Sequence, residues 1–117
     1  MTKREMCDRT RKFNTDVINF CSDFPRNAAG FEVAKQLIRS AGSVGANYRA
    51  LLRSKSRPDF INKLAIVLEE SDESHYWLEI IRDTKMKTTD DTNRLINEAN
   101  ELTAIFAAML KTTKQRK

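Results

Sequence analysis

The segment QLIRSAGSVGANYRALLRSKSRP, residues 36–58, combines small residues at helical spacing with charge of a single sign. Its apolar residues recur every three or four positions, which predicts one face of a helix, and Pro58 suits the first turn of a following helix. Between Val33 and Pro58 the chain has six basic residues and no acidic one, the six being Lys35, Arg39, Arg49, Arg53, Lys55 and Arg57. Such a helix needs anions, which come either from a neighbouring helix of the same molecule or from a polyanion outside it.

Helical periodicity continues on both sides of this segment and predicts four amphipathic helices. The first ends at Pro25, the second runs from about Phe31 to Ser54, the third from Pro58 to near residues 85–87, and the fourth follows the polar turn KMKTTDDT. No stretch alternates with period two for long enough to predict a strand. The side chains expected to face the core are Met6, Thr10, Phe13, Val17, Phe20 or Cys21, and Phe24; Phe31, Ala34, Leu37, Ile38, Ala41, Val44, Gly45, Tyr48, Leu51 and Leu52; Phe60, Leu64, Val67, Leu68, Ser71, Trp77 or Leu78, and Ile81; and Leu95, Ile96, Ala99, Leu102, Ile105, Phe106, Met109 and Leu110.

The short connections between these helices favour antiparallel neighbours. We therefore expect an all-α fold, an antiparallel up-down-up-down four-helix bundle. Residues 1–117 are enough for one modest core, so we expect a single domain with basic, partly flexible termini. Within the second helix, Gly42 and Gly45 each cost roughly 1 kcal/mol relative to alanine, which predicts that a neighbouring helix approaches closely there. Ser56 is the expected N-cap of the third helix, with Asp59 in its first turn.

Composition indicates a cytoplasmic protein with some affinity for anions. The formal charge is +5, which favours anionic surfaces or nucleic acid as partners. Cys7 and Cys21 lie fourteen residues apart in one predicted helix, a separation of about 21 Å that excludes a disulfide within that helix and predicts buried thiols. The chain has no signal-peptide pattern and no apolar run near the roughly 20 residues of a transmembrane helix, so no membrane association is expected.

The sequence offers little for catalysis or metal binding. Asp72 and His75 have the spacing used in dimetal bundles, but such sites need a second pair, and the chain has one histidine. Two cysteines and one histidine do not make a zinc site, and His75 is the only candidate base for a nucleophilic cysteine. The AGSVGAN segment lacks the ending of a phosphate-binding loop. We therefore predict no catalytic residues, metal, cofactor or small-molecule substrate.

The third predicted helix supplies acids for part of the basic segment. From Asp59 through Asp83 there are seven acidic residues. Antiparallel pairing places Arg39 level with Asp72 and Glu73, and Lys35 level with Tyr76, so ion pairs within the chain are expected to neutralise both cations. The remaining cations of the segment have only Asp59 nearby and predict a positive cap suited to phosphate contacts. These are Arg49, Arg53, Lys55 and Arg57.

The alternatives to a nucleic-acid site are a cap that only aids solubility, or one that pairs with the acidic helix of a neighbouring subunit. Tyr48 can in principle stack on a base beside Arg49, but its spacing favours a place at the edge of the core. Trp77 is likewise expected to pack rather than to recognise a ligand.

The motif SAGSVGANYRA, followed by SRPDFINKLAIVLEESDESHYWLEII, resembles the small bacterial four-helix bundle proteins encoded in intervening sequences of 23S ribosomal RNA genes. The resemblance covers residues 30–83. It implies an up-down bundle that assembles into a homo-oligomer, commonly a pentameric ring, with no established enzymatic activity. A related bundle is the nucleic-acid-binding accessory subunit of a retroelement reverse transcriptase, which implies RNA or DNA as a partner. The matching positions are Ser40, Ser43, Gly45, Ala46, Asn47, Tyr48 and Arg49, then Asp59, Phe60, Lys63, Leu64, Glu70, Glu73, Ser74, Trp77 and Leu78.

The preferred interpretation is a non-enzymatic homo-oligomer that binds nucleic acid, with structured RNA favoured, through the four basic residues of the cap. In a ring, the carboxylates of Glu69, Glu70 and Glu73 in one subunit are expected to face Arg39 or Arg49 of the next. The alternative is a protein-interaction scaffold whose basic cap is merely solvated.

Overall fold

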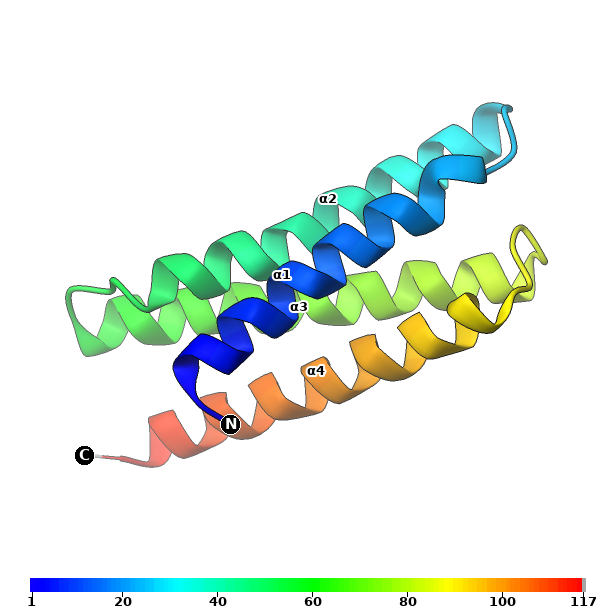
Figure 1. Cartoon of the computed structure of the whole chain (residues 1–117). Coiled ribbons are helices and arrows are strands. Elements are labelled where there is room, and N and C mark those ends of the chain that lie inside the picture. Colours follow the sequence, from blue (N-terminus) through cyan, green and yellow to red (C-terminus); the bar gives the residue numbers. More distant parts are fainter. Residues whose placement is uncertain (117) are drawn as a thin grey trace.

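The computed structural model describes residues 1–116, which form four long helices that alternate in direction (Figure 1). Helix α1 spans Lys3–Phe20 and continues into a 3₁₀ turn at Cys21–Asp23; α2 spans Ala28–Leu51, α3 spans Arg57–Asp83 and α4 spans Asp90–Gln115. The predicted all-α, up-down-up-down four-helix bundle is confirmed. The molecule is a rod of 49 × 21 × 20 Å.

Local signals set the helix ends. The predicted N-cap of α3 is confirmed, because the Ser56 hydroxyl accepts a hydrogen bond from the backbone N–H of Asp59. Helix α2 ends at Leu51, three residues before the predicted limit. Helix α3 also ends earlier than predicted, because Lys85 has a φ of 57° and the N–H of Met86 donates back to Ile81. This left-handed residue with its returning hydrogen bond closes the helix.

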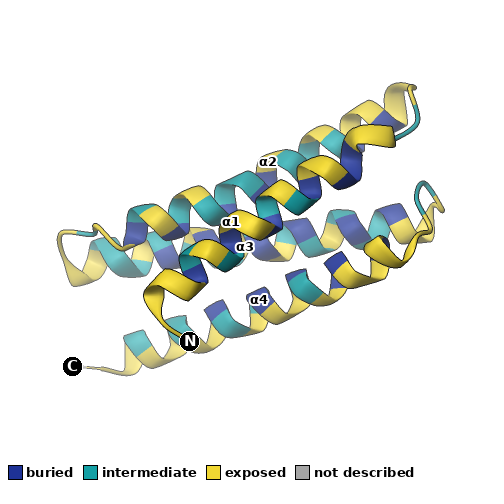
Figure 2. Ribbon diagram, in the orientation of Figure 1, coloured by how far each residue is buried: buried dark blue, intermediate teal, exposed yellow. Residues whose placement is uncertain are grey.

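The buried residues line the inner faces of the four helices (Figure 2). Most side chains predicted to face the core are buried or half-buried, but the prediction is wrong for Phe31, which is 63% exposed, and for Leu52. The buried stripe of α2 begins at Gly30 instead, because a Cβ there would lie 2.0 Å from the carbonyl oxygen of Pro25. The incoming chain thus covers Gly30 and leaves Phe31 outside, while Leu52 follows the last residue of α2.

Helix α1 lies against the small residues of α2, as predicted. A Cβ on Gly45 would lie 3.4 Å from the carbonyl oxygen of Thr10, and one on Gly42 would lie 3.5 Å from Oδ1 of Asn14. These distances are ordinary van der Waals contacts, so α1 approaches closely but leaves room for alanine at both positions.

Polar contacts fix the relative positions of the helices. The hydroxyl of Ser74 in α3 donates to that of Ser40 in α2 at 2.9 Å, and both side chains are fully buried. Between α1 and α4, Arg9 pairs with Glu98 at 2.6 Å. The hydrogen bonds that the Arg9 guanidinium donates to Glu98 and Glu101 raise its pKa despite its partial burial. None of the helices in residues 1–116 has an apolar stretch long enough to span a membrane.

Candidate nucleic-acid interface

One end of the bundle gathers most of the excess positive charge. Because the helices alternate in direction, the α2–α3 turn, the start of α1 and the end of α4 lie toward the same end (Figure 1). We call residues 1–8, 49–59 and 107–116 the basic end; they hold nine basic and three acidic residues. Residues 9–48 and 60–106 hold eleven basic and thirteen acidic residues, so the basic end accounts for the net positive charge of the described chain. Its nine basic residues are Lys3, Arg4, Arg49, Arg53, Lys55, Arg57, Lys111, Lys114 and Arg116.

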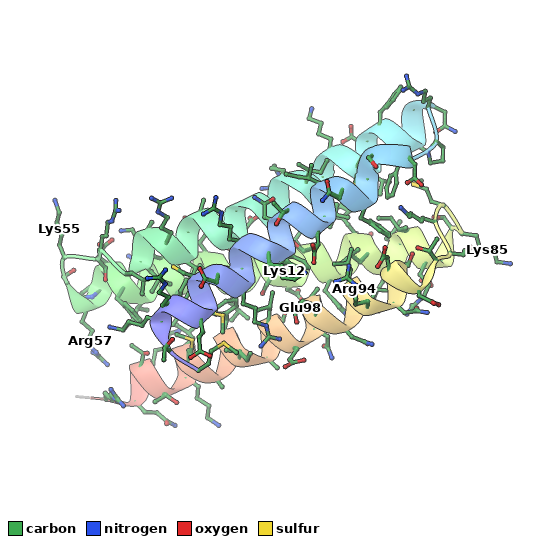
Figure 3. All side chains as sticks on the ribbon, viewed as in Figure 1. Lys12, Lys55, Arg57, Lys85, Arg94 and Glu98 are labelled. Atoms are coloured by element: carbon green, nitrogen blue, oxygen red, sulfur yellow. The ribbon has the colours of Figure 1, made fainter. Side chains whose placement is uncertain are left out.

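Three of the four cap residues predicted from sequence are solvated cations. Arg49 lies in the last turn of α2, and Arg53 and Lys55 lie in the turn that follows; all three are exposed, and no carboxylate within residues 1–116 forms an ion pair with them. Figure 3 shows the Lys55 side chain pointing away from the bundle. The acid of this corner, Asp59, is already occupied by the ammonium of Lys63, which lowers the pKa of Asp59 through a hydrogen bond.

The fourth cap residue, Arg57, has a different environment. Its Nη2 donates a 2.8 Å hydrogen bond to the carbonyl oxygen of Thr113 and a further hydrogen bond to that of Arg116, at the end of α4. The last carbonyls of a helix carry partial negative charge and lack partners within the helix. Arg57 therefore caps α4, whereas the sequence interpretation grouped it with three solvated cations.

Arg39 lies away from the basic end and pairs with carboxylates of its own chain. Its Nη1 lies 3.1 Å from Oε2 of Glu70, and its Nη2 pairs with Glu73. The sequence placed Arg39 level with Asp72 and Glu73; Asp72 instead faces solvent. Partial burial raises the pKa of Glu70, an effect that the nearby Arg39 opposes. The expected neutralisation of Lys35 is not observed, since no carboxylate in the described chain pairs with it.

Two recessed surfaces lie on different helices. The first, the α1–α2 groove, has a volume of about 470 Å³; it is lined by Cys7, Asp8, Arg11, Asn14, Gly42, Gly45, Ala46 and Arg49. The second, the α3 patch, is a shallow and open surface on α3 alone; it is lined by Glu69, Glu70, Asp72, Glu73, Tyr76 and Trp77. The sequence analysis assigned roles to the glutamates of the patch and to Arg49 of the groove. It gave no role to Arg11, because the sequence does not show which residues of α1 lie opposite α2.

The aromatic residues considered for base stacking pack inside the bundle. Tyr48 is 2% exposed, and its ring lies 5.9 Å from that of Phe106, measured between centroids. Trp77 is half-buried, and its Nε1 has no hydrogen-bond partner among residues 1–116. The interpretation of Tyr48 as a packing residue is confirmed, and it provides no surface for a nucleobase.

The two thiols and the histidine have different surroundings. Cys21 is buried, which raises the pKa of its thiol to about 11, and Cys7 is half-buried; neither is in a disulfide. His75 lies 3.4 Å from Glu79 on the same helix. Within residues 1–116, no three His, Cys, Asp or Glu side chains are arranged to hold a metal ion.

Comparison with known proteins identifies relatives of the whole bundle. Residues 2–108 match the family model described as 23S rRNA-intervening sequence protein. A protein of unknown function from the S23 ribosomal protein family of Bacteroides thetaiotaomicron VPI-5482, whose crystal structure was determined at 1.70 Å resolution, is 32% identical and superposes with a TM-score of 0.84. The alignment covers 95% of this chain and 99% of that one. No curated protein matches the sequence significantly.

Proposed function

Because this chain belongs to the 23S rRNA-intervening sequence protein family, as its sequence resemblance predicted, we propose that it is a non-enzymatic, homo-oligomeric bundle that binds structured RNA through the basic end. The main evidence for this proposal is that Arg49, Arg53 and Lys55 are exposed and have no carboxylate partner in residues 1–116. The two unpaired thiols support a reducing compartment, the cytoplasm, as the place of action.

Electrostatics supports binding in one orientation. Guanidinium and ammonium groups contact phosphate oxygens and release the counterions condensed on a nucleic acid. Residues 9–48 and 60–106 have an excess of acids, so the rest of the rod repels a polyanion while the basic end attracts it. A nucleic acid is therefore expected to approach along the axis of the rod rather than along its sides.

The lack of stacking surfaces supports a base-paired ligand. In the described part of the basic end no aromatic side chain is strongly exposed, since the exposed aromatic residues are Phe31 and Tyr76. Proteins that bind single strands stack bases on aromatic rings, whereas double-stranded RNA is recognised through its phosphates and its shape. The basic end thus suits duplex RNA and contacts that are independent of sequence.

Assembly would multiply these weak contacts. The family resemblance implies a homo-oligomer, commonly a pentamer, and several basic ends held rigidly together gain avidity without any new contact. The alternative, a protein-interaction scaffold with a solvated basic end, predicts no RNA binding beyond that of any cationic protein.

Filter binding of a labelled RNA duplex separates these two functions. We expect the double variant Arg53→Glu/Lys55→Glu to lose affinity on the order of tenfold or more at moderate salt, because two phosphate contacts become repulsions. The matched control is Arg26→Glu/Lys85→Glu, which makes the same change in net charge at exposed residues away from the basic end; Figure 3 shows Lys85 at the opposite end from Lys55. Equal losses in the two variants, or no binding by the wild type, would favour the scaffold.

A further inference from the structure

We propose that the α3 patch of one copy docks into the α1–α2 groove of a second copy, and that this head-to-tail contact builds the homo-oligomer. The inference rests on the homo-oligomeric part of the proposed function and is independent of RNA binding. Two properties of the two surfaces support it, their charges and their shapes.

The rim of the α1–α2 groove has two cations and one anion, Asp8, and so an excess of one positive charge, and its floor is open. Arg11 of α1 and Arg49 of α2 are both exposed, and neither forms an ion pair with a carboxylate of residues 1–116. The floor contains Gly42 and Gly45, and a Cβ on either would make only ordinary contacts with α1. Each glycine nevertheless costs about 1 kcal/mol of helix stability. Packing inside the bundle therefore does not account for both glycines, whereas a side chain entering the groove would need the space.

The α3 patch has a negative surface and a projecting ring. Glu69 and Asp72 are exposed and have no ion-pair partner in the described chain, while Glu70 and Glu73 are turned toward Arg39. Tyr76 follows Asp72 by four residues and so lies on the same face of the helix. It is 53% exposed and packs edge-on against Trp77, with the ring centroids 5.1 Å apart. The patch thus presents an aromatic ring beside two free carboxylates.

These surfaces complement one another. Docking would bring Asp72 to Arg49 and Glu69 to Arg11, and would place the Tyr76 ring over the glycine floor. The groove, of about 470 Å³, is large enough to admit a tyrosine ring.

The geometry determines the kind of assembly. The groove lies on α1 and α2 and the patch on α3, so the contact joins two different surfaces. Contacts of this type form closed rings when the rotation between neighbours closes, and filaments otherwise. Arg49 lines the groove and also belongs to the basic end, so assembly would engage Arg49 and leave Arg53 and Lys55 as the principal cations for RNA.

Native mass spectrometry of the nuclease-treated full chain tests the contact by charge exchange. We expect Arg49→Glu and Asp72→Arg each to raise the dissociation constant of the assembly at least about tenfold and to yield monomers, while the double variant regains the oligomer because the charges are exchanged across every interface. Tyr76→Ala should also weaken assembly. Circular dichroism should show an intact fold in each case, because all three side chains are exposed.

The RNA-deficient variant Arg53→Glu/Lys55→Glu is the control and should keep the wild-type mass. If the two single variants also keep that mass, or if the double variant stays monomeric, this contact is not the interface, while the homo-oligomer and RNA binding still stand. A monomeric wild type would contradict both the homo-oligomer and the contact, and RNA binding would still be decided by the filter assay.

Discussion

The guanidinium of Arg57 donates a hydrogen bond of 2.8 Å to the carbonyl oxygen of Thr113, fifty-six residues further along the chain. This contact fastens the start of α3 to the end of α4. It also separates Arg57 from Arg49, Arg53 and Lys55, whose charges face water. Of these four cap residues, one therefore has a structural role and three are available to a ligand.

Removal of this cap should loosen the end of α4. We expect Arg57→Ala to lower the free energy of unfolding by about 0.5–1 kcal/mol, because the last carbonyls of α4 lose a charged donor. Hydrogen exchange should quicken at the amides of residues 113–116. Arg53→Ala serves as the control, since Arg53 is exposed and makes no ion pair within residues 1–116; equal exchange in the two variants would show that Arg57 does not cap the helix.

The glycines of α2 should respond in opposite ways to the same substitution. In Gly30→Ala the new Cβ would lie 2.0 Å from the carbonyl oxygen of Pro25, so the backbone must shift, and we expect a loss of about 1–3 kcal/mol or more. In Gly42→Ala the nearest atom would be 3.5 Å away, so the better helix propensity of alanine should raise stability by up to about 1 kcal/mol. Urea unfolding at one protein concentration measures both; a similar loss in the two variants would contradict the difference in space.

Stability should depend on pH through Asp16, which joins α1 to α4. Its Oδ2 lies 2.8 Å from Lys12 and 3.2 Å from Arg94. Partial burial acts to raise the pKa of Asp16, but the hydrogen bonds from these two cations outweigh it, so the pKa is lowered. A carboxyl whose pKa is lower in the folded protein stabilises the fold above its unfolded pKa, and that contribution is lost as the pH falls through the folded pKa.

Accordingly, Asp16→Asn should be less stable than the wild type at pH 7, by about 0.5–1 kcal/mol. The difference should shrink as the pH falls below the unfolded pKa of about 3.9. Thermal unfolding of both proteins between pH 7 and pH 2 measures this, and a difference that stays constant over the whole range would exclude Asp16 as its source.

The fold could be predicted from the sequence because its determinants are local. Apolar spacing marked the four helices, and the Ser56 cap marked the start of α3. The errors arose where tertiary contacts act. Phe31 is a large apolar residue of the kind usually found in a core, but Pro25 covers the neighbouring Gly30 instead. Helix α3 ends at the left-handed conformation of Lys85. A lysine in the sequence gives no indication of that conformation.

The candidate site was predictable only in part. The lack of acids between Val33 and Pro58 is visible in the chain, and it led to the exposed cations of the basic end. The partner of Arg57 is a set of backbone carbonyls, which every residue possesses, so no side-chain pattern identifies it. Arg11 and the two glycines line the same groove only because of how α1 lies across α2. The spacing of apolar residues does not determine that arrangement.

The salt dependence of duplex RNA binding tests the central claim most directly. If Arg53 and Lys55 contact phosphates, the logarithm of the affinity should fall steeply with the logarithm of the salt concentration, and the slope of Arg53→Glu/Lys55→Glu should be smaller by about two. The control Arg26→Glu/Lys85→Glu should keep the wild-type slope. A slope that is the same for the wild type and both variants would contradict the account, because the cations of the basic end would then make no phosphate contacts.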